Sequence, residues 1–172
     1  MKIRHTGVLY DDPARSTPGY VLISPVDGDQ VYLLDPIGEV AHQWQTGGGM
    51  TNWCYLLPNG NLFINERCAE PKGVALTVSG RLCEYAPDGT LVWSHEDPYQ
   101  HHDARRLPQG AIYAAFTELN AAQKAAVPGG IPGSDPEGGP FGEVIREVDE
   151  EGNVLWEWNL ANLGMETHPI HP

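Results

Sequence analysis

The sequence predicts an all-β fold, a β-propeller built from four-stranded antiparallel blades. One phrase, a strand, a tight turn with glycine and a second strand, occurs at Val31–Trp44, Leu82–Trp93 and Val144–Trp156. Its turn glycines are Gly38, Gly89 and Gly152, so the steps between them are 51 and 63 residues. A second phrase lies between these copies, because Tyr55–Phe63 resembles Arg106–Tyr113. Repeats of this period are typical of stacked sheet units such as propeller blades.

Each repeat unit is predicted to contain four strands in two hairpins. In the clearest unit, the first hairpin joins residues 53–57 to 61–66, and the second joins residues 81–85 to 90–94. Pro-Asn-Gly and Pro-Asp-Gly turns place proline at the first central turn position and glycine where a positive φ is needed. The flanking runs alternate and are rich in Val, Ile, Leu and aromatic residues, as expected of strands.

The units are expected as blade pieces of one partial propeller domain over residues 1–172. The pieces cover about 18–46, 52–95 and 102–160, and the first starts with a strand that has no preceding hairpin partner. About two and a half blades are too few to close a ring. We therefore expect the chain to be the N-terminal part of a longer protein; a small domain that dimerises to complete a ring is the alternative.

An insertion at about 118–142 lengthens the second step. Most of it is rich in Gly and Pro, which disfavour long strands and helices. Its first part, Leu119–Ala126, is the best helical candidate in the chain, with Asn120 as the N-cap.

Charge and hydropathy exclude several classes of protein. The net charge is −13 at pH 7 and the pI is near 4.7, which argues against binding to nucleic acid or to anionic membranes, since both need a basic surface. No apolar run is long enough to span a bilayer, and the N-terminus lacks a secretory signal, so a cytoplasmic location is expected. Cys54, Cys68 and Cys83 have no metal-ligand spacing and are interpreted as reduced, mostly buried thiols.

The densest group of reactive side chains lies between the outermost strand of one unit and the innermost strand of the next. It contains His101, His102 and Asp103, followed by Arg105 and Arg106. In a propeller this connection reaches the central channel. Because side chains alternate along a strand, Arg105 is expected to share the face of Asp103.

This group suggests chemistry on an anion. A histidine at a channel mouth can act as a nucleophile or as a general acid or base, because it titrates near neutrality. An adjacent arginine can bind an anionic group through its planar fork of donors. The combination suits transfer of a sulfuryl or phosphoryl group.

Two other interpretations of the same group stay open. His-His-Asp can be a turn whose side chains bond to the backbone and to each other. Two histidines and an aspartate can also be metal ligands, although neighbouring histidines on a strand seldom reach one ion, and we assign no metal.

Further histidines and the tryptophans are placed by the repeat. His95 is expected in the same loop as His101, lining the same mouth. His168 and His171 fall in the next outer-to-inner connection and are candidate binding residues. The outer-strand tryptophans are expected to pack between blades; they are Trp44, Trp93, Trp156 and Trp158.

These phrases resemble the arylsulfotransferase-like propeller family, which is itself similar to quinoprotein-type propellers. The matching segments span most of residues 7–160; they are Tyr10–Pro13 with Pro18–Leu22, Val31–Trp44, Tyr55–Leu62 and His101–Gly110. The resemblance implies a six-bladed propeller that moves a sulfuryl group from an aryl sulfate to a phenol through a sulfated histidine, without a nucleotide cofactor. The family's His-Asp pair corresponds to His102 and Asp103.

The resemblance therefore implies an arylsulfotransferase-like enzyme with small-molecule partners, an aryl sulfate and a phenol. His102 is the predicted nucleophile or acid–base, with Asp103 orienting it, Arg105 binding the anion and His101 beside it. The alternative is a propeller without catalytic activity that binds a ligand or a protein on its channel face.

Overall fold

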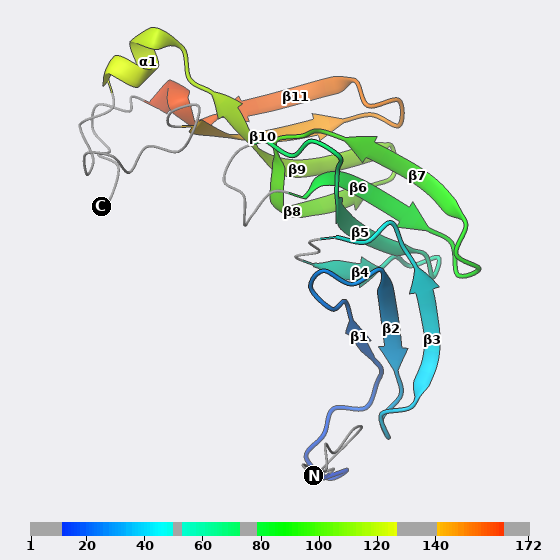
Figure 1. The fold of residues 1–172 in the computed structure, drawn as a ribbon. Coiled ribbons are helices and arrows are strands. Elements are labelled where there is room, and N and C mark those ends of the chain that lie inside the picture. The colour runs from blue at the N-terminus through cyan, green and yellow to red at the C-terminus, as the bar shows by residue number, and fades with distance from the viewer. Residues whose placement is uncertain (1–11, 50–52, 73–78, 127–140, 164–172) are drawn as a thin grey trace, which may run out of the picture.

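The computed structural model describes residues 12–49, 53–72, 79–126 and 141–163, which form three antiparallel sheets (Figure 1). The first sheet contains β1 (Val21–Ile23), β2 (Gln30–Leu34) and β3 (Val40–Gln45). The second contains β4 (Cys54–Leu56), β5 (Leu62–Arg67), β6 (Gly80–Tyr85) and β7 (Leu91–Glu96). The third contains β8 (Gln100–Leu107), β9 (Gly110–Glu118), β10 (Phe141–Val148) and β11 (Val154–Asn159), followed by a 3-10 turn at Leu160–Leu163. The predicted all-β class is confirmed.

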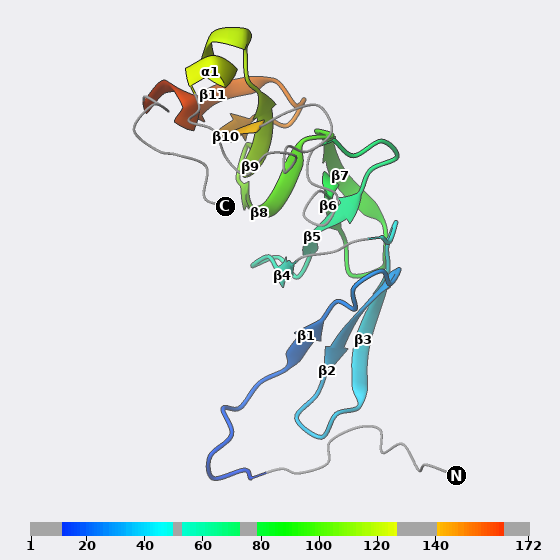
Figure 2. The ribbon, with the colours of Figure 1, turned by 60° about the vertical axis from the view of Figure 1, so that its left-hand side comes forward.

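Strands that follow one another in sequence are also neighbours in each sheet, so every sheet is a simple meander. The sheets succeed one another along an arc, with β1, β4 and β8 on its inner side and β3, β7 and β11 on its outer side (Figures 1 and 2). The first sheet has only three strands within the described residues. Its β2–β3 hairpin corresponds to β6–β7, so the strand that it lacks is the innermost one.

Two apolar layers hold the sheets together. The layer between the first and second sheets contains Val31, Trp44, Leu62, Ile64, Cys83 and Tyr85. The layer between the second and third sheets contains Phe63, Leu82, Trp93, Ala104, Ala111, Tyr113, Ala115, Val144 and Val148. In this second layer the alanines of the third sheet leave room for the large rings of Phe63 and Trp93, which fits the dense packing of protein interiors.

Outer-strand tryptophans link successive sheets. The Trp44 indole N–H donates to the carbonyl of Ala86 at 3.1 Å, and the Trp93 indole donates to the carbonyl of Glu150 at 3.0 Å. Both carbonyls lie in the outer hairpin turn of the following sheet, so the expected packing of these two tryptophans between units is confirmed. Trp156 and Trp158 on β11 are 49% and 42% exposed, because no described residue follows on that face as a further sheet.

The predicted helix is also confirmed. Helix α1 runs from Ala121 to Ala126. The Asn120 side-chain oxygen accepts the Gln123 N–H, and the Gln123 side-chain oxygen accepts the Asn120 N–H, both at 2.9 Å. This reciprocal capping satisfies N–H groups that the helix start leaves free. Residues 127–140 of the insertion lie outside the described part, and no helix of that part could cross a bilayer.

Candidate functional site

The histidine pair lies in a bulge of β8, the innermost strand of the third sheet. Gln100 pairs with Ala115 and Ala104 pairs with Tyr113, so residues 101–103 stand opposite a single residue of β9. His102 has a φ of 51°, the left-handed region that residues other than glycine rarely adopt. The sequence predicted a loop here; the structure has an irregular strand, and such bulges redirect side chains next to functional sites.

The second sheet holds the bulge in place through the backbone of His102. The Trp53 indole N–H and the Asn65 side-chain amide both donate to the His102 carbonyl. Asn65 is fully buried and also donates to the Ser79 hydroxyl at 2.7 Å. The unusual backbone conformation is therefore fixed by two residues that lie far away in sequence.

His101 is buried between His102 and a carboxylate. Its Nε2 lies 2.8 Å from an oxygen of Glu143, on β10, and its Nδ1 lies 2.9 Å from Nδ1 of His102. His101 is 5% exposed, and its ring packs against Phe116 with 4.0 Å between ring centroids. The three side chains form the chain Glu143–His101–His102, which leaves Nε2 of His102 without a bond to the other two.

His102 lines a cleft of about 490 Å³ between β4 and β8. The other residues of this cleft are Trp53, Cys54, Tyr55, Asp103 and Arg105. Three of the four predicted catalytic residues therefore line one cleft, and the fourth, His101, contacts His102 from behind.

Asp103 and Arg105 form an ion pair on the same face of β8, as strand alternation predicted. Asp103 also accepts the N–H of Ala104 at 2.9 Å. It contacts Arg105 rather than His102, so the orienting contact predicted for Asp103 is made by His101 instead.

The cleft combines a cation with aromatic rings. The Arg105 side chain is 59% exposed, and its guanidinium carbon lies 5.5 Å from the centre of the Tyr55 ring. Tyr55 stacks on Trp53 with 5.7 Å between centroids. Such a surface suits a planar aromatic group that carries an anion.

Cys54 is a poor nucleophile although it lines the cleft. Burial raises the pKa of its thiol to about 11, and the thiolate is the reactive form. The three cysteines are free, and two of them, Cys68 and Cys83, are buried as predicted.

His95 does not lie in the loop that the sequence predicted. It belongs to β7 and is packed between the second and third sheets, where it stacks on Trp93. The Tyr113 hydroxyl donates to Asp97, so His95 Nε2, 3.0 Å away, donates to the Tyr113 oxygen. The residue is absent from the lining of the cleft, because β7 extends two residues beyond the expected strand end.

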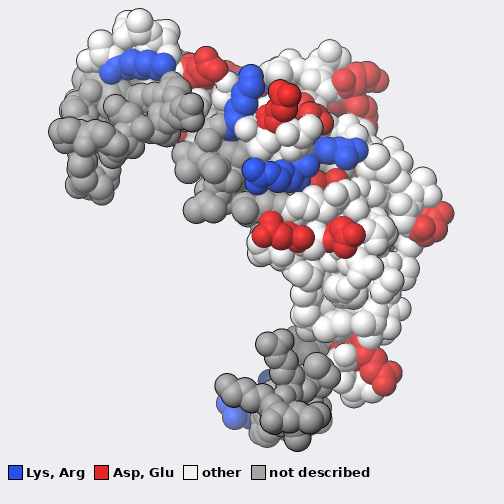
Figure 3. Space-filling model, in the orientation of Figure 1, with Lys and Arg blue, Asp and Glu red and all other residues white. Residues whose placement is uncertain are grey.

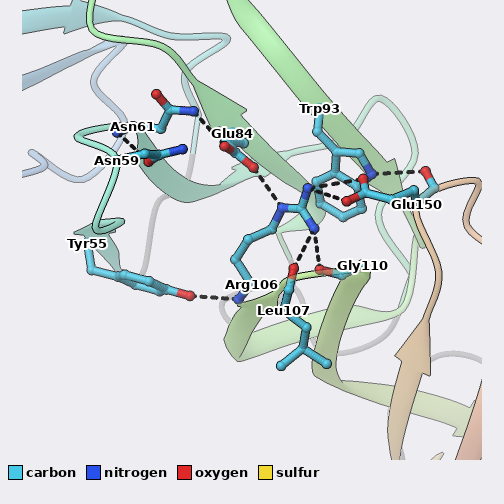
Figure 4. Close-up of polar contacts among 9 residues, drawn as sticks. All are labelled: Tyr55, Asn59, Asn61, Glu84, Trp93, Arg106, Leu107, Gly110 and Glu150. Atoms are coloured by element: carbon cyan, nitrogen blue, oxygen red, sulfur yellow. Dashed lines mark hydrogen bonds and ion pairs between the residues drawn. The ribbon is translucent and has the colours of Figure 1, made fainter.

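Arg106, next to Arg105, points the other way and is fully occupied (Figure 4). Its Nε donates to Glu84 at 2.7 Å, one terminal nitrogen donates to the Leu107 and Gly110 carbonyls, and the other donates to both oxygens of Glu150. Its guanidinium also lies 4.5 Å from the centre of the Trp93 ring. All five donors of the side chain are used, so Arg106 joins the sheets and has no donor left for a ligand.

Two predicted residues, His168 and His171, lie outside the described residues. Within the part that is described, no group of three or more His, Cys, Asp or Glu side chains could hold a metal ion. Cationic and acidic side chains lie close together on the central part of the face in Figure 3. In the cleft itself, Arg105 is paired with Asp103.

Sequence reasoning missed four residues that build the site: Glu143, Asn65, Trp53 and Tyr55. The last two belong to the strand predicted at residues 53–57, which precedes the innermost turn of its unit. No local spacing indicated Glu143, which reaches His101 across 42 residues.

No protein-family model matches the chain, and no curated protein matches it. Among solved structures, it is similar to a protein of unknown function from Bacteroides caccae. The TM-score is 0.50 and the sequence identity 15%, over 82% of this chain and 46% of that protein. The chain thus spans less than half the length of that protein, and a likeness at this identity concerns the fold alone.

Proposed function

We propose that the three sheets are blades of a six-bladed propeller and that the protein transfers a sulfuryl group from an aryl sulfate to a phenol through His102. The main support for this reaction is the cleft between β4 and β8. It contains an exposed imidazole, a cation and two stacked aromatic rings, while the buried His101, bonded to Glu143, holds the other ring nitrogen of His102.

The repeated contact between sheets supports the ring. A hydrogen bond from an outer-strand tryptophan to a turn carbonyl of the next sheet joins the first sheet to the second, through Trp44, and the second to the third, through Trp93. The outward face of the third sheet presents Trp156 and Trp158 in the corresponding place, exposed. A further sheet on this face would continue the arc and bury the two rings.

The proposed reaction has two displacements at sulfur. Nε2 of His102 attacks the sulfur, the bond between sulfur and the aryl oxygen breaks, and the aryl oxide leaves and takes a proton from water. His102 then carries the sulfuryl group as an imidazolium. The oxygen of a phenol attacks the sulfur, the N–S bond breaks, the phenol proton passes to water, and His102 returns to its neutral form.

Each part of the cleft has a role in this scheme. Arg105 binds the sulfate oxygens, since its planar donors match an oxyanion. Tyr55 and Trp53 stack with the aryl group of donor or acceptor. Glu143 compensates the positive charge of the intermediate through His101.

The test is sulfuryl transfer from 4-nitrophenyl sulfate to phenol, and the rate is measured by the release of 4-nitrophenol. Replacing His102 by glycine, which accepts a φ of 51° without strain, should reduce the rate at least about 100-fold. Arg105→Ala should raise KM for the donor about tenfold. His42→Gln replaces an imidazole that lies outside the cleft. This variant serves as the control and should keep the wild-type rate. Equal rates for wild type and His102→Gly would exclude the proposal.

The same cleft also favours a second function, binding of an aromatic anion without turnover. The stacked Trp53–Tyr55 pair and the cation above it form a recognition surface without any chemistry at His102. Under this alternative 4-nitrophenyl sulfate would bind, Arg105→Ala would weaken binding, and no 4-nitrophenol would be released by the wild type.

A further inference from the structure

We infer that Glu143 is a positioning residue that acts through His101 and sets which nitrogen of His102 carries a proton. Asp103 contacts Arg105 and does not take this role. The inference rests on the geometry of the site, and the role of Glu143 in turnover rests on the proposed function.

The hydrogen bonds determine which ring nitrogen carries the proton, first in His101 and then in His102. A carboxylate only accepts, so His101 Nε2 must donate to Glu143 across their 2.8 Å contact. A neutral imidazole has one donor and one acceptor, so His101 Nδ1 is then an acceptor. The proton in the 2.9 Å contact between the two Nδ1 atoms therefore belongs to His102.

The consequence lies at the cleft. With its proton on Nδ1, neutral His102 has a lone pair on Nε2, the nitrogen that makes no contact with His101. If the hydrogen bonds among Glu143, His101 and His102 ran in the opposite direction, the proton of His102 would lie on Nε2 and block attack from that atom. Glu143 thus selects the nucleophilic tautomer of His102 without contacting a substrate.

Packing keeps this arrangement in one orientation. Phe116 covers the face of the His101 ring, and the two histidine rings meet at 90°. The Trp53 and Asn65 side chains hold the His102 carbonyl. His101 is nearly fully buried, while the Glu143 side chain is 47% exposed, so Glu143 can be replaced with little effect on the core.

The experiment measures the tautomers directly. The protein labelled with ¹⁵N-histidine is studied by long-range ¹H–¹⁵N NMR at pH 8, where ordinary imidazoles are neutral, because protonated and bare ring nitrogens have different ¹⁵N shifts. We expect His102 with protonated Nδ1 and bare Nε2. Glu143→Ala should move His102 towards the Nε2-protonated form and lower the rate of sulfuryl transfer at least about tenfold with little change in KM.

Two further variants make the result specific. Glu143→Gln keeps an acceptor without charge and should lie between wild type and Glu143→Ala. Glu147→Ala removes a carboxylate from the same strand and should leave the His102 spectrum and the rate unchanged. Backbone amide spectra report whether each variant is folded.

The outcomes separate this inference from the proposed function. A His102 spectrum with protonated Nε2 in the wild type, or one that Glu143→Ala leaves unchanged, would overturn the inference. A tautomer shift as expected in a protein that transfers no sulfuryl group would support the inference and contradict the proposed function.

Discussion

His95 is a half-buried imidazole whose titration should affect stability. Burial is the main cause that lowers the pKa of His95 below its ordinary value of 6.5, and nearby Arg146 lowers it further, while Asp97 opposes both. The unfolded chain therefore binds this proton at higher pH than the folded protein does. The stability that His95 contributes is complete above pH 6.5 and is lost as the pH falls through the folded pKa.

His95→Gln tests this. The amide can still donate to the Tyr113 oxygen but does not titrate. Urea unfolding at pH 7.5 and pH 5 should show that the variant loses less free energy of unfolding than wild type between these two values. An equal loss in both proteins would show that His95 titrates normally in the folded state.

At the scale of residues, part of the site follows from the sequence. Strand alternation correctly placed Arg105 beside Asp103. The repeat placed His102 at the start of an innermost hairpin, and its strand β8 lies on the inner side of the arc (Figure 1). Glu143 could not be predicted as a site residue, because its pairing with Phe116 depends on the register in which β10 joins β9. The β8 bulge could not be foreseen either, since it depends on bonds from Trp53 and Asn65 in another sheet.

Among the elements, the β8–β9 hairpin depends on Arg106. Its side chain is 11% exposed, and the guanidinium bridges Glu84 of β6 to Glu150 of the β10–β11 turn. Removing one member of a buried ion pair leaves a charge without compensation, which costs about 3–5 kcal/mol.

Arg106→Ala should therefore lower the free energy of unfolding by about 3–5 kcal/mol in urea denaturation. Arg105→Ala is the matched control, because Arg105 is the next residue on the same strand and is largely exposed. It should change stability by no more than about 0.5 kcal/mol. Similar losses in both variants would contradict the assignment of Arg106 to the joint between the sheets.

The hairpins also show where repeat alignment fails. The alignment of Tyr55–Phe63 with Arg106–Tyr113 pairs Pro58 with Pro108 and Gly60 with Gly110. In the structure, Leu57 N–H bonds to Asn61 across a longer turn, whereas Leu107 pairs directly with Gly110. Asn61 is thus the structural counterpart of Gly110, since one turn is a residue shorter. Repetition in sequence predicted strand number and order correctly but could not fix register.

For the whole molecule, equivalent tryptophans have different surroundings. Trp93 and Trp156 both lie four residues after the turn glycine of their hairpin, but Trp93 is 8% exposed and Trp156 is 49% exposed. The difference follows from the third sheet, which covers Trp93, while no described residue covers Trp156 in the same way.

Replacing each tryptophan by glutamate compares the two faces. Trp93→Glu should lower the free energy of unfolding by at least about 3 kcal/mol, whereas Trp156→Glu should change it little and should reduce self-association through the exposed apolar face. Urea unfolding and sedimentation velocity measure the two effects. A large loss of stability in Trp156→Glu would show that its face is already covered in solution.

The most direct test of the proposed function is the mass of the intact protein after brief exposure to 4-nitrophenyl sulfate without acceptor, with peptide mapping of any adduct. We predict that one sulfuryl group is added, that it maps to His102, that phenol removes it, and that His102→Gly does not acquire it. A wild-type mass that stays unchanged while 4-nitrophenol is released, or an adduct on another residue, would contradict transfer through His102.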